Sequence, residues 1–241
     1  MATKISVIIA AFNEEKLLGR CLTSLQKQSY PKKKYEIIVV DNGSKDKTFQ
    51  IAKEHHVRVY PYTQLQGCGP SRKFGISKAN GSIIAITDAD SVAPSDWLEK
   101  IDQALRDDGV VAIGGVAIPD KKNIWTRSIF HFYNAFFLIN NFFGKPIFWG
   151  FNMAVKRAAY DEVGGIKEDL LGSDDWELLI RLKKKNGRKA IIYSQNVTVT
   201  TSTRKQSDIK IFLRYTIDGM KNYIDLVILN RIKGLPVFNV R

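Results

Sequence analysis

Short apolar runs, separated by amphipathic stretches, organise the first half of the chain. Residues 83–86 are four consecutive apolar residues, three of them Ile, between Gly81 and the acids Asp88 and Asp90. A short run rich in β-branched residues predicts a strand that is buried on both faces. Runs of the same kind predict further strands at residues 4–11, 35–40, 57–60, 110–116, 190–193 and 197–201.

Apolar residues with helical spacing fill the intervals between several of these runs. A helix that ends before Pro31 is predicted from the helical spacing of Leu17, Leu18, Cys21, Leu22 and Leu25, and Asn13 is expected to cap it. Further helices are predicted from Ser44 or Asp46 to about Glu54 and at residues 72–79, 95–105 and 208–230. Strands that alternate with helices predict an α/β fold with a mostly parallel central sheet and flanking helices.

Polar residues gather where three of the predicted strands end. The segments are Ala10 to Asn13, Asp41 to Ser44, and Asp88 to Asp90. Each one alone also fits an ordinary turn, which favours Asp, Asn and Gly. Together they predict one edge of the sheet that is rich in acceptors, at the carboxyl ends where open α/β sheets bind their ligands.

The chemistry of this edge favours a cation and a phosphate. Asp88 and Asp90 repel each other unless a cation lies between them, and oxygen ligands suit Mg²⁺ or Mn²⁺. The glycine-rich segment Gly67 to Arg72 enters a helix, and glycine backbones and helix N-termini suit anions. This segment matches neither the phosphate-loop motif nor Gly-x-Gly-x-x-Gly.

The second half opens with an aromatic segment at residues 124–148, after Gly114 and Gly115, which are expected to loosen the end of a strand. Two interpretations of this segment stay open: a helix that packs on the sheet, or a surface helix that enters a bilayer or receives a lipid tail. Three interpretations of the apolar helix at 208–230 stay open: a dimer contact, a membrane-lying helix, or a cover for the acceptor groove.

Composition narrows the class of protein. Of the 241 residues, 37 are Lys or Arg and 24 are acids, so the net charge of +13 favours an anionic partner. No nucleic-acid motif is found, so we expect no nucleic acid partner. Two cysteines, no leader and no uninterrupted apolar stretch of about 18 residues predict a cytoplasmic protein, with a peripheral position on the cytoplasmic membrane face left open.

Several motifs in order resemble family 2 glycosyltransferases. They are Ser6 to Glu15, Val39 to Thr48, Arg72 to Gly75, and Asp88 to Asp90. The resemblance covers roughly residues 4–205. It implies a single Rossmann-like nucleotide-diphospho-sugar transferase fold of the A type (GT-A). We expect this domain at 1–205, with a nucleotide-binding half at 1–117 and an acceptor and catalytic half at 118–205, and an amphipathic helix and tail at 206–241.

The resemblance also assigns roles. Asp41 would read the base, commonly uracil, Asp88 would approach the ribose, and Asp90 would hold Mg²⁺ or Mn²⁺ on the diphosphate. Asp175 matches the general base of the family's Glu-Asp-x-Glu element, although position 174 is Asp where the family more often has Glu. The full set of expected substrate-binding residues is Ala10, Phe12, Asn13, Glu14, Asp41, Gly67, Arg72, Asp88, Ala89, Trp149, Gly150, Asn152, Asp174 and Arg204.

Two positions in the second half keep alternatives. Trp149 could stack on a sugar ring or belong to the core. Many relatives carry a metal-touching His near residues 201–205, and this chain has none, so Thr201, Ser202 or water is expected to complete the metal shell. Arg204 remains a clamp for the diphosphate.

The expected function is inverting, metal-dependent transfer of a sugar from a nucleotide-diphosphate sugar, with UDP as the favoured nucleotide, to a hydroxyl acceptor. A sugar, a lipid-linked sugar and a protein all fit as the acceptor. Whether the chain forms a homodimer stays open. One alternative is a nucleotidyltransferase, but residues 10–15 lack the glycine- and basic-rich loop that such enzymes usually carry. The other is a non-catalytic scaffold on a membrane surface, which would not need both acidic clusters, the first with Asp88 and Asp90 and the second with Asp174 and Asp175.

Overall fold

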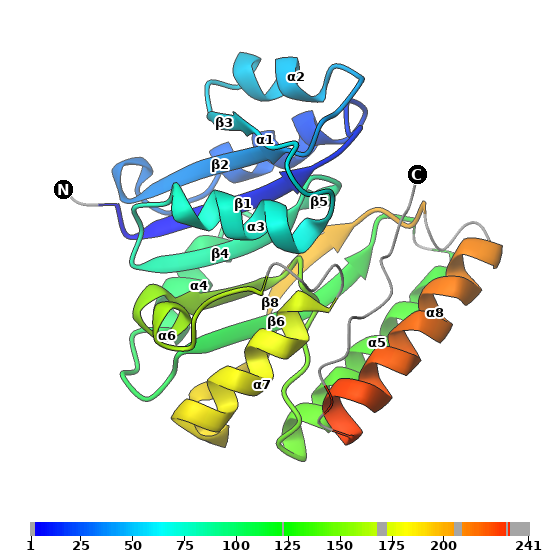
Figure 1. Cartoon of the computed structure of the whole chain (residues 1–241). Helices are drawn as coiled ribbons and strands as arrows, with labels where there is room; N and C mark the ends of the chain where they lie inside the picture. The colour runs from blue at the N-terminus through cyan, green and yellow to red at the C-terminus, as the bar shows by residue number, and fades with distance from the viewer. Residues whose placement is uncertain (1–2, 122, 168–172, 205–208, 230, 232–241) are drawn as a thin grey trace.

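The computed structural model describes residues 3–121, 123–167, 173–204, 209–229 and 231, and one eight-stranded sheet runs through it (Figure 1). The strands are β1 (Ile5–Ala11), β2 (Tyr35–Asp41), β3 (Arg58–Pro61), β4 (Ile83–Asp88), β5 (Ser91–Val92), β6 (Ala112–Pro119), β7 (Met153–Lys156) and β8 (Ile191–Thr201). The helices are α1 (Leu18–Gln26), α2 (Thr48–Glu54), α3 (Cys68–Ser77), α4 (Trp97–Ala104), α5 (Ile124–Phe142), α6 (Arg157–Glu162), α7 (Asp174–Asn186) and α8 (Ile209–Tyr223), with short turns at Lys32–Lys34, Arg188–Ala190 and Ile224–Ile228.

The sheet is mixed, with strand order β3-β2-β1-β4-β7-β6-β8-β5. Strands β3, β2, β1 and β4 are parallel neighbours, as the alternating pattern predicts. Strand β7 is antiparallel to both of its neighbours, which are β4 and β6. Strands β6 and β8 are parallel, and β5 pairs antiparallel with β8. The α/β class is therefore confirmed, and β3, β2, β1 and β4 form a continuous parallel part of the sheet. Strand β6 continues across the expected division at 117/118.

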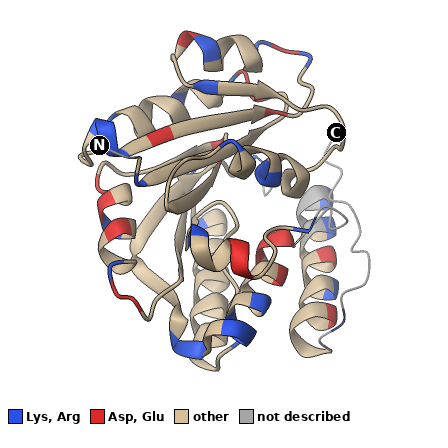
Figure 2. Ribbon diagram, turned by 60° about the vertical axis from the view of Figure 1, so that its left-hand side comes forward, with Lys and Arg blue, Asp and Glu red and all other residues tan. Residues whose placement is uncertain are grey.

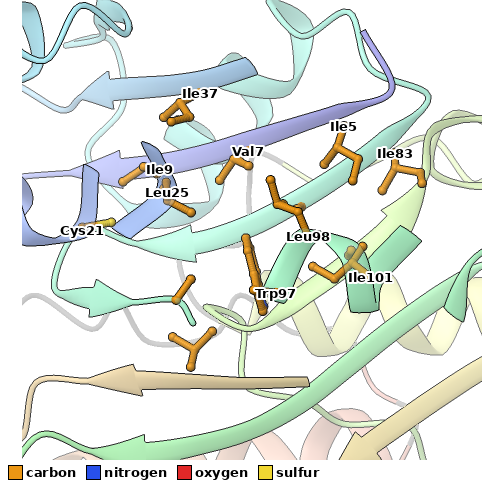
Figure 3. Close-up of a cluster of buried hydrophobic side chains, with 14 of the residues drawn as sticks. Ile5, Val7, Ile9, Cys21, Leu25, Ile37, Ile83, Trp97, Leu98 and Ile101 are labelled. Atoms are coloured by element: carbon orange, nitrogen blue, oxygen red, sulfur yellow. The ribbon is translucent and has the colours of Figure 1, made fainter. Parts of the chain in front are cut away.

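Helices cover both faces of the sheet because the buried strands carry apolar side chains on both sides. On one face, Ile5, Val7 and Ile9 of β1 belong to a cluster with apolar residues of α1, α2 and α4, part of which Figure 3 shows. On the other face, Ile8 and Ile84 pack with apolar residues of α3, α6 and α7. This three-layer arrangement fixes the carboxyl ends of β1, β2 and β4 at one rim.

The glycine pair in β6 permits close packing. It does not loosen the end of the strand, which differs from the expectation in the sequence analysis. A Cβ atom at Gly114 would lie 2.2 Å from the ring of Phe148, and one at Gly115 would lie 1.8 Å from the carbonyl oxygen of Val197. The β6–β8 register also shifts between Gly115 and Val116. This irregularity explains why one long strand, β8, was predicted as two.

The connection from β1 to α1 differs from the prediction in its cap. Helix α1 begins at Leu18 after Leu17, which makes no side-chain capping bond. Asn13 instead adopts a left-handed backbone with φ of 55°, and its side-chain oxygen accepts a hydrogen bond from the Lys45 amide (2.9 Å). Asn13 therefore joins the loops after β1 and β2 and does not cap the helix.

Helices α5 and α8 lie side by side at one end of the molecule (Figure 1). Helix α5 packs against β6 and β8, and α8 contacts α5 through Phe136 and Tyr223, whose ring centroids are 5.1 Å apart. Within the described residues, no helix is both long enough and apolar enough to cross a membrane. The expected boundary at 205/206 and the tail from 232 lie outside the described residues.

Candidate functional site

Three strands end together at the rim that carries the acids. Parallel pairing sets Ala10 beside Asp88 and Ala11 beside Asp41, so the loops after β1, β2 and β4 start at one level. Within this edge Ala10 is half-buried and Ala89 is buried, whereas Phe12 and Asn13 are exposed. The strand-end segments that the sequence singled out are thus neighbours in space.

Asp41 offers an unused acceptor at this rim. Its side chain is only 5% exposed, and its Oδ1 atom has no hydrogen-bond partner within the described part of the chain. A buried acceptor without a partner is costly, so a ligand that donates an N–H or O–H group there would be favoured. The next residue, Asn42, holds the facing loop, because it donates to the carbonyls of Tyr62 and Leu65 and accepts from the Gly67 amide.

Arg72 connects the first acidic cluster to the second. The side chain is buried, and its guanidinium donates to Asp88 Oδ1 at 3.0 Å and to Asp174 Oδ2 at 3.3 Å. Burial alone would lower the pKa of Arg72, but the carboxylates of Asp174 and Asp88 outweigh it and hold the pKa well above its usual value. This guanidinium, expected near the nucleotide, therefore also joins the segment of Asp88 to that of Asp174, which lies 102 residues along the chain from Arg72.

Asp175 lies beside Gly150, and the charge of Arg72 acts on it. A Cβ atom at Gly150 would be 2.2 Å from Asp175 Oδ2 and 3.2 Å from Arg72 Nη1, so only glycine leaves room for the carboxylate. Desolvation and the neighbouring charge of Asp174 raise the pKa of Asp175 to about 7, although Arg72 and the Trp176 amide oppose the rise. A carboxyl group with its pKa near neutrality suits proton transfer.

A second ion-pair group surrounds Asp90. Arg204 Nη2 lies 3.3 Å from Asp90 Oδ2, and the same guanidinium forms a two-pronged pair with Glu14, in which Nη1 donates to Oε2 at 2.9 Å. Thr201, which stands near the family's expected histidine position, contacts Asp90 through its hydroxyl at 3.5 Å. The hydrogen bond to Glu14 raises the pKa of Arg204, so the guanidinium stays charged.

Trp149 belongs to an aromatic cluster beside the rim. Its ring stacks on Phe130, and Phe137 meets it edge to face with centroids 4.9 Å apart. Its indole N–H donates to Asn134 Oδ1 at 2.8 Å. Half-buried Trp149 thus has both core contacts and an accessible part. Asn134 had not been expected here, and its only sequence signal is a polar residue inside an aromatic helix.

Asn152 corrects the prediction made for it. Its side chain is fully buried, donates to the carbonyls of Val116 and Val197, and accepts a hydrogen bond from the Trp97 indole. These bonds use both ends of the buried amide, so the side chain of Asn152 supports the sheet. The sequence alone cannot tell an Asn152 that binds substrate from one that supports the sheet, because all three hydrogen-bond partners are distant along the chain.

The charges of the rim fit a divalent cation. Glu14, Asp41, Asp88, Asp90, Asp174 and Asp175 supply six carboxyl groups, and Arg72 and Arg204 supply two guanidinium groups. The Asp90 carboxylate and the Thr201 hydroxyl beside it offer oxygen atoms, which Mg²⁺ and Mn²⁺ prefer. Among the described residues, however, no three His, Cys, Asp or Glu side chains form a group that could hold a metal ion by themselves. A cation at Asp90 would therefore need further oxygens from a substrate or water.

Solved structures with the same architecture bind nucleotide sugars. The mannosyltransferase PcManGT of Pyrobaculum calidifontis, in complex with GDP-Man and Mn²⁺, matches 97% of this chain and 66% of its own, with a TM-score of 0.77 and 23% identity. S. aureus TarS 1-349, in complex with UDP-GlcNAc, matches 96% and 68%, with a TM-score of 0.71 and 19% identity. These likenesses show the fold, which is the GT-A fold.

Curated relatives share more sequence. Glycosyltransferase AglE of Haloferax volcanii is 36% identical over 116 residues, which are 46% of this chain and 38% of AglE. The dolichyl-phosphate beta-glucosyltransferase of Drosophila melanogaster is 35% identical over 147 residues, covering 53% and 45%. The chain thus spans less than half the length of either protein.

A third relative matches most of the chain. It is the dolichyl N-acetyl-alpha-D-glucosaminyl phosphate 3-beta-D-2,3-diacetamido-2,3-dideoxy-beta-D-glucuronosyltransferase of Methanococcus voltae, 27% identical over 237 residues, covering 88% of this chain and 70% of its own. The sequence model of glycosyl transferase family 2 matches residues 6–164, which include β1 to β7 and the acids of the first cluster. The chain therefore belongs to glycosyl transferase family 2.

Proposed function

We propose that this chain transfers a sugar from a nucleotide-diphosphate sugar to a hydroxyl group of a lipid-linked sugar, with inversion at the anomeric carbon. The observation that carries the proposal is the double ion pair of Arg72, which joins Asp88 of the first acidic cluster to Asp174 of the second. The charge of the same guanidinium acts on Asp175, so a carboxyl group with its pKa near 7 stands close to this bridge.

Asp175 is the proposed general base. It takes the proton of the acceptor hydroxyl as that oxygen attacks the anomeric carbon from the side opposite to the diphosphate. Gly150 leaves space beside the Asp175 carboxylate, and Arg72 counters the charge of Asp174, so that Asp175 can ionise near neutral pH. A single base without a second nucleophile implies one displacement, and therefore inversion.

Asp90 is the proposed protein ligand of a divalent cation, with the hydroxyl of Thr201 beside it. When bound, Mg²⁺ or Mn²⁺ would neutralise negative charge on the leaving diphosphate. Arg204 already lies next to Asp90 and is held by Glu14, so it can donate hydrogen bonds to the same phosphates. The proposal of a metal ion is supported by the oxygen atoms beside Asp90 and by the excess of carboxyl groups over guanidinium groups at the rim.

The donor and acceptor classes rest on recognition chemistry and on the relatives. The unused Asp41 Oδ1 acceptor suits the N–H of a base, and we propose uracil. A neighbouring structure binds UDP-GlcNAc, but another binds GDP-Man, so guanine is the competing base. Two relatives are named for dolichyl-linked substrates, which supports a lipid-linked acceptor.

A thermal-shift panel tests the donor side directly. UDP, GDP and CDP are each added with and without Mn²⁺, and we expect UDP with Mn²⁺ to raise the Tm most. Asp90→Ala should lose the Mn²⁺-dependent part of the shift. Asp108→Ala, which removes an exposed acid elsewhere, should keep it. If none of the nucleotides raises the Tm, the enzyme proposal fails in favour of a non-catalytic scaffold.

Transfer itself is tested with a panel of nucleotide sugars and a short-chain polyprenyl-linked sugar acceptor. The anomeric configuration of the product is then read from proton NMR coupling constants. Retention of the donor configuration would contradict the single displacement. Transfer only to a soluble sugar or a protein would contradict the lipid-linked acceptor and leave the donor chemistry intact.

A further inference from the structure

The described part of α8 and the turn after it carry an exposed apolar stripe. Leu213, Ile217, Met220, Ile224 and Ile228 are each about half exposed, with Met220 the most exposed at 60%. Their spacing of four, three, four and four residues places them on one helical face. That face is opposite to Leu226, which is buried against Trp176 and Ile180.

Helix α5 and the residue after it carry a matching stripe. Trp125, Phe132, Ile139 and Phe143 are between 55% and 69% exposed, and the first three recur every seven residues. Phe130 and Phe137 lie on another face of this helix and are buried. An amphipathic helix on a protein surface normally turns polar residues outward, so both helices break this rule in the same way.

The two stripes form one surface, which we call the α5–α8 face. The helices run in parallel, because Tyr133 meets Thr216 (3.2 Å between hydroxyl oxygens) and Asn140, two turns later, accepts from the Tyr223 hydroxyl (2.6 Å). On a helical wheel, each stripe lies beside these contacts and away from its helix's buried side. Both stripes therefore face outward together, along the pair of helices in Figure 1.

Basic side chains border this face. Arg214 and Lys221 of α8 are 70% and 65% exposed in their side chains, and their nearest carboxylate, Asp218, is mostly covered. A cavity of about 360 Å³, bordered by Lys145, Lys183 and Lys184, lies on the other side of α8, where Leu226 is buried, and is not part of this border. In Figure 2, basic and acidic residues alternate along α8.

We propose that the α5–α8 face is a docking surface for an anionic lipid bilayer. Apolar side chains would enter the interface, and the bordering lysines and arginines would contact lipid phosphates. A second copy of this chain fits less well, since a symmetric contact would bring two basic borders together. This proposal does not depend on the reaction proposed above. Docking on a bilayer would also bring the rim close to a lipid-linked acceptor.

The position of the face relative to the rim supports this choice. Asn222 of α8 is buried and donates to Ser173 Oγ at 2.9 Å, next to the N-terminus of α7 that carries Asp174 and Asp175. At the other edge, Asp120 just before α5 accepts hydrogen bonds from the amide and the hydroxyl of Thr203. The helices of the face are thus attached directly to the two segments that supply Asp175 and Arg204.

Vesicle flotation tests the apolar part. The wild-type chain is mixed with vesicles of phosphatidylcholine alone, or with about one third phosphatidylglycerol, and we expect it to float with the anionic vesicles. Phe132→Ser with Ile139→Ser should weaken this binding at least about tenfold. Because both side chains are mostly exposed, the circular dichroism spectrum and the Tm should stay close to wild type.

A matched pair of charge variants tests the basic border. Arg214→Glu with Lys221→Glu and Lys33→Glu with Lys34→Glu change the net charge equally, but the first pair lies on α8 and the second pair lies before β2, and all four side chains are exposed. Only the first pair should weaken vesicle binding. Equal weakening by both pairs, or no flotation of the wild type, would overturn the proposal. A wild-type dimer in light scattering that Phe132→Ser with Ile139→Ser makes monomeric would assign the face to a second copy instead.

Discussion

The environment of Asp175 sets how the proposed reaction should depend on pH. Burial and Asp174 raise its pKa to about 7, and only the ionised form can accept a proton. We expect kcat/KM to rise with pH up to about 7 and then to level off. Asp175→Asn should lose about 10²–10⁴-fold in kcat while nucleotide affinity stays near wild type. Full transfer activity in this variant would remove Asp175 from the mechanism.

The same carboxyl group should reduce the stability of the fold above neutral pH. Its pKa in the folded chain lies above the ordinary value of 3.8, so the folded state holds the proton more tightly. The stability that this proton supplies is complete below pH 3.8 and is lost as the pH rises through 7. Asp175→Asn should therefore be more stable than wild type in urea unfolding at pH 8, by a margin that shrinks towards pH 4.

Glu14 should keep Arg204 from occupying the place of the cation. Arg204 is shared between Glu14 and Asp90, and without Glu14 its charge would pair with Asp90 alone. Glu14→Gln should weaken Mn²⁺ binding about tenfold in calorimetry, and adding Arg204→Gln should restore it. Glu15→Gln, which alters an exposed side chain that accepts only from the Lys47 amide among the bonds described, is the control. An unchanged Mn²⁺ affinity in Glu14→Gln would show that the two groups do not compete.

At the scale of residues, the sequence predicts chemistry well and partners poorly. Asp88 and Asp90 could be placed at a strand end because the apolar run before them is unambiguous. The pairing of Arg72 with Asp174 could not be foreseen, because nothing local links residues 102 positions apart. Asn152 shows the opposite error, since a motif that resembles a substrate loop turned out to hold the sheet together.

At the scale of elements, the loop before β7 should tolerate no side chain at Gly150. A methyl group there would lie 2.2 Å from Asp175 Oδ2 and force the carboxylate away. Gly150→Ala should lower kcat about a hundredfold or more with little change in nucleotide binding. Gly219→Ala is the control, because a Cβ atom there meets nothing within 4 Å. Equal activity of both variants would show that the position of Asp175 is not critical.

The elements of the first half follow from the sequence because β-branched runs and helical spacing alternate there. The second half was harder to predict, since β7 runs antiparallel and the polar residues Ser194 to Asn196 divide β8 into two apparent strands. Helix α5 was recognisable as an aromatic segment. Its sides could not be assigned, because apolar residues occur all round it and only packing against β6, β8 and α8 separates them.

At the scale of the whole molecule, Asp174 should contribute to stability as well as to the site. It balances the buried charge of Arg72. Without Asp174, the ion pair with Asp88 is the one described here that Arg72 would retain. Asp174→Asn should reduce the free energy of unfolding by about 3 kcal/mol, measured by urea denaturation. Asp161→Asn, which removes an exposed acid, should leave it almost unchanged. A loss confined to activity would mean that the ion pair positions groups without stabilising the fold.

The bridge through Arg72 also limits how such proteins can exchange parts. The family match ends at residue 164, yet the guanidinium inside that region depends on a carboxylate from residue 174. A chimaera that joins this nucleotide half to the acceptor half of a relative must bring an acid to the same place, or leave the buried guanidinium without its second carboxylate. Exchange of acceptor halves between relatives should therefore succeed only when the arginine and its distant acid are inherited together.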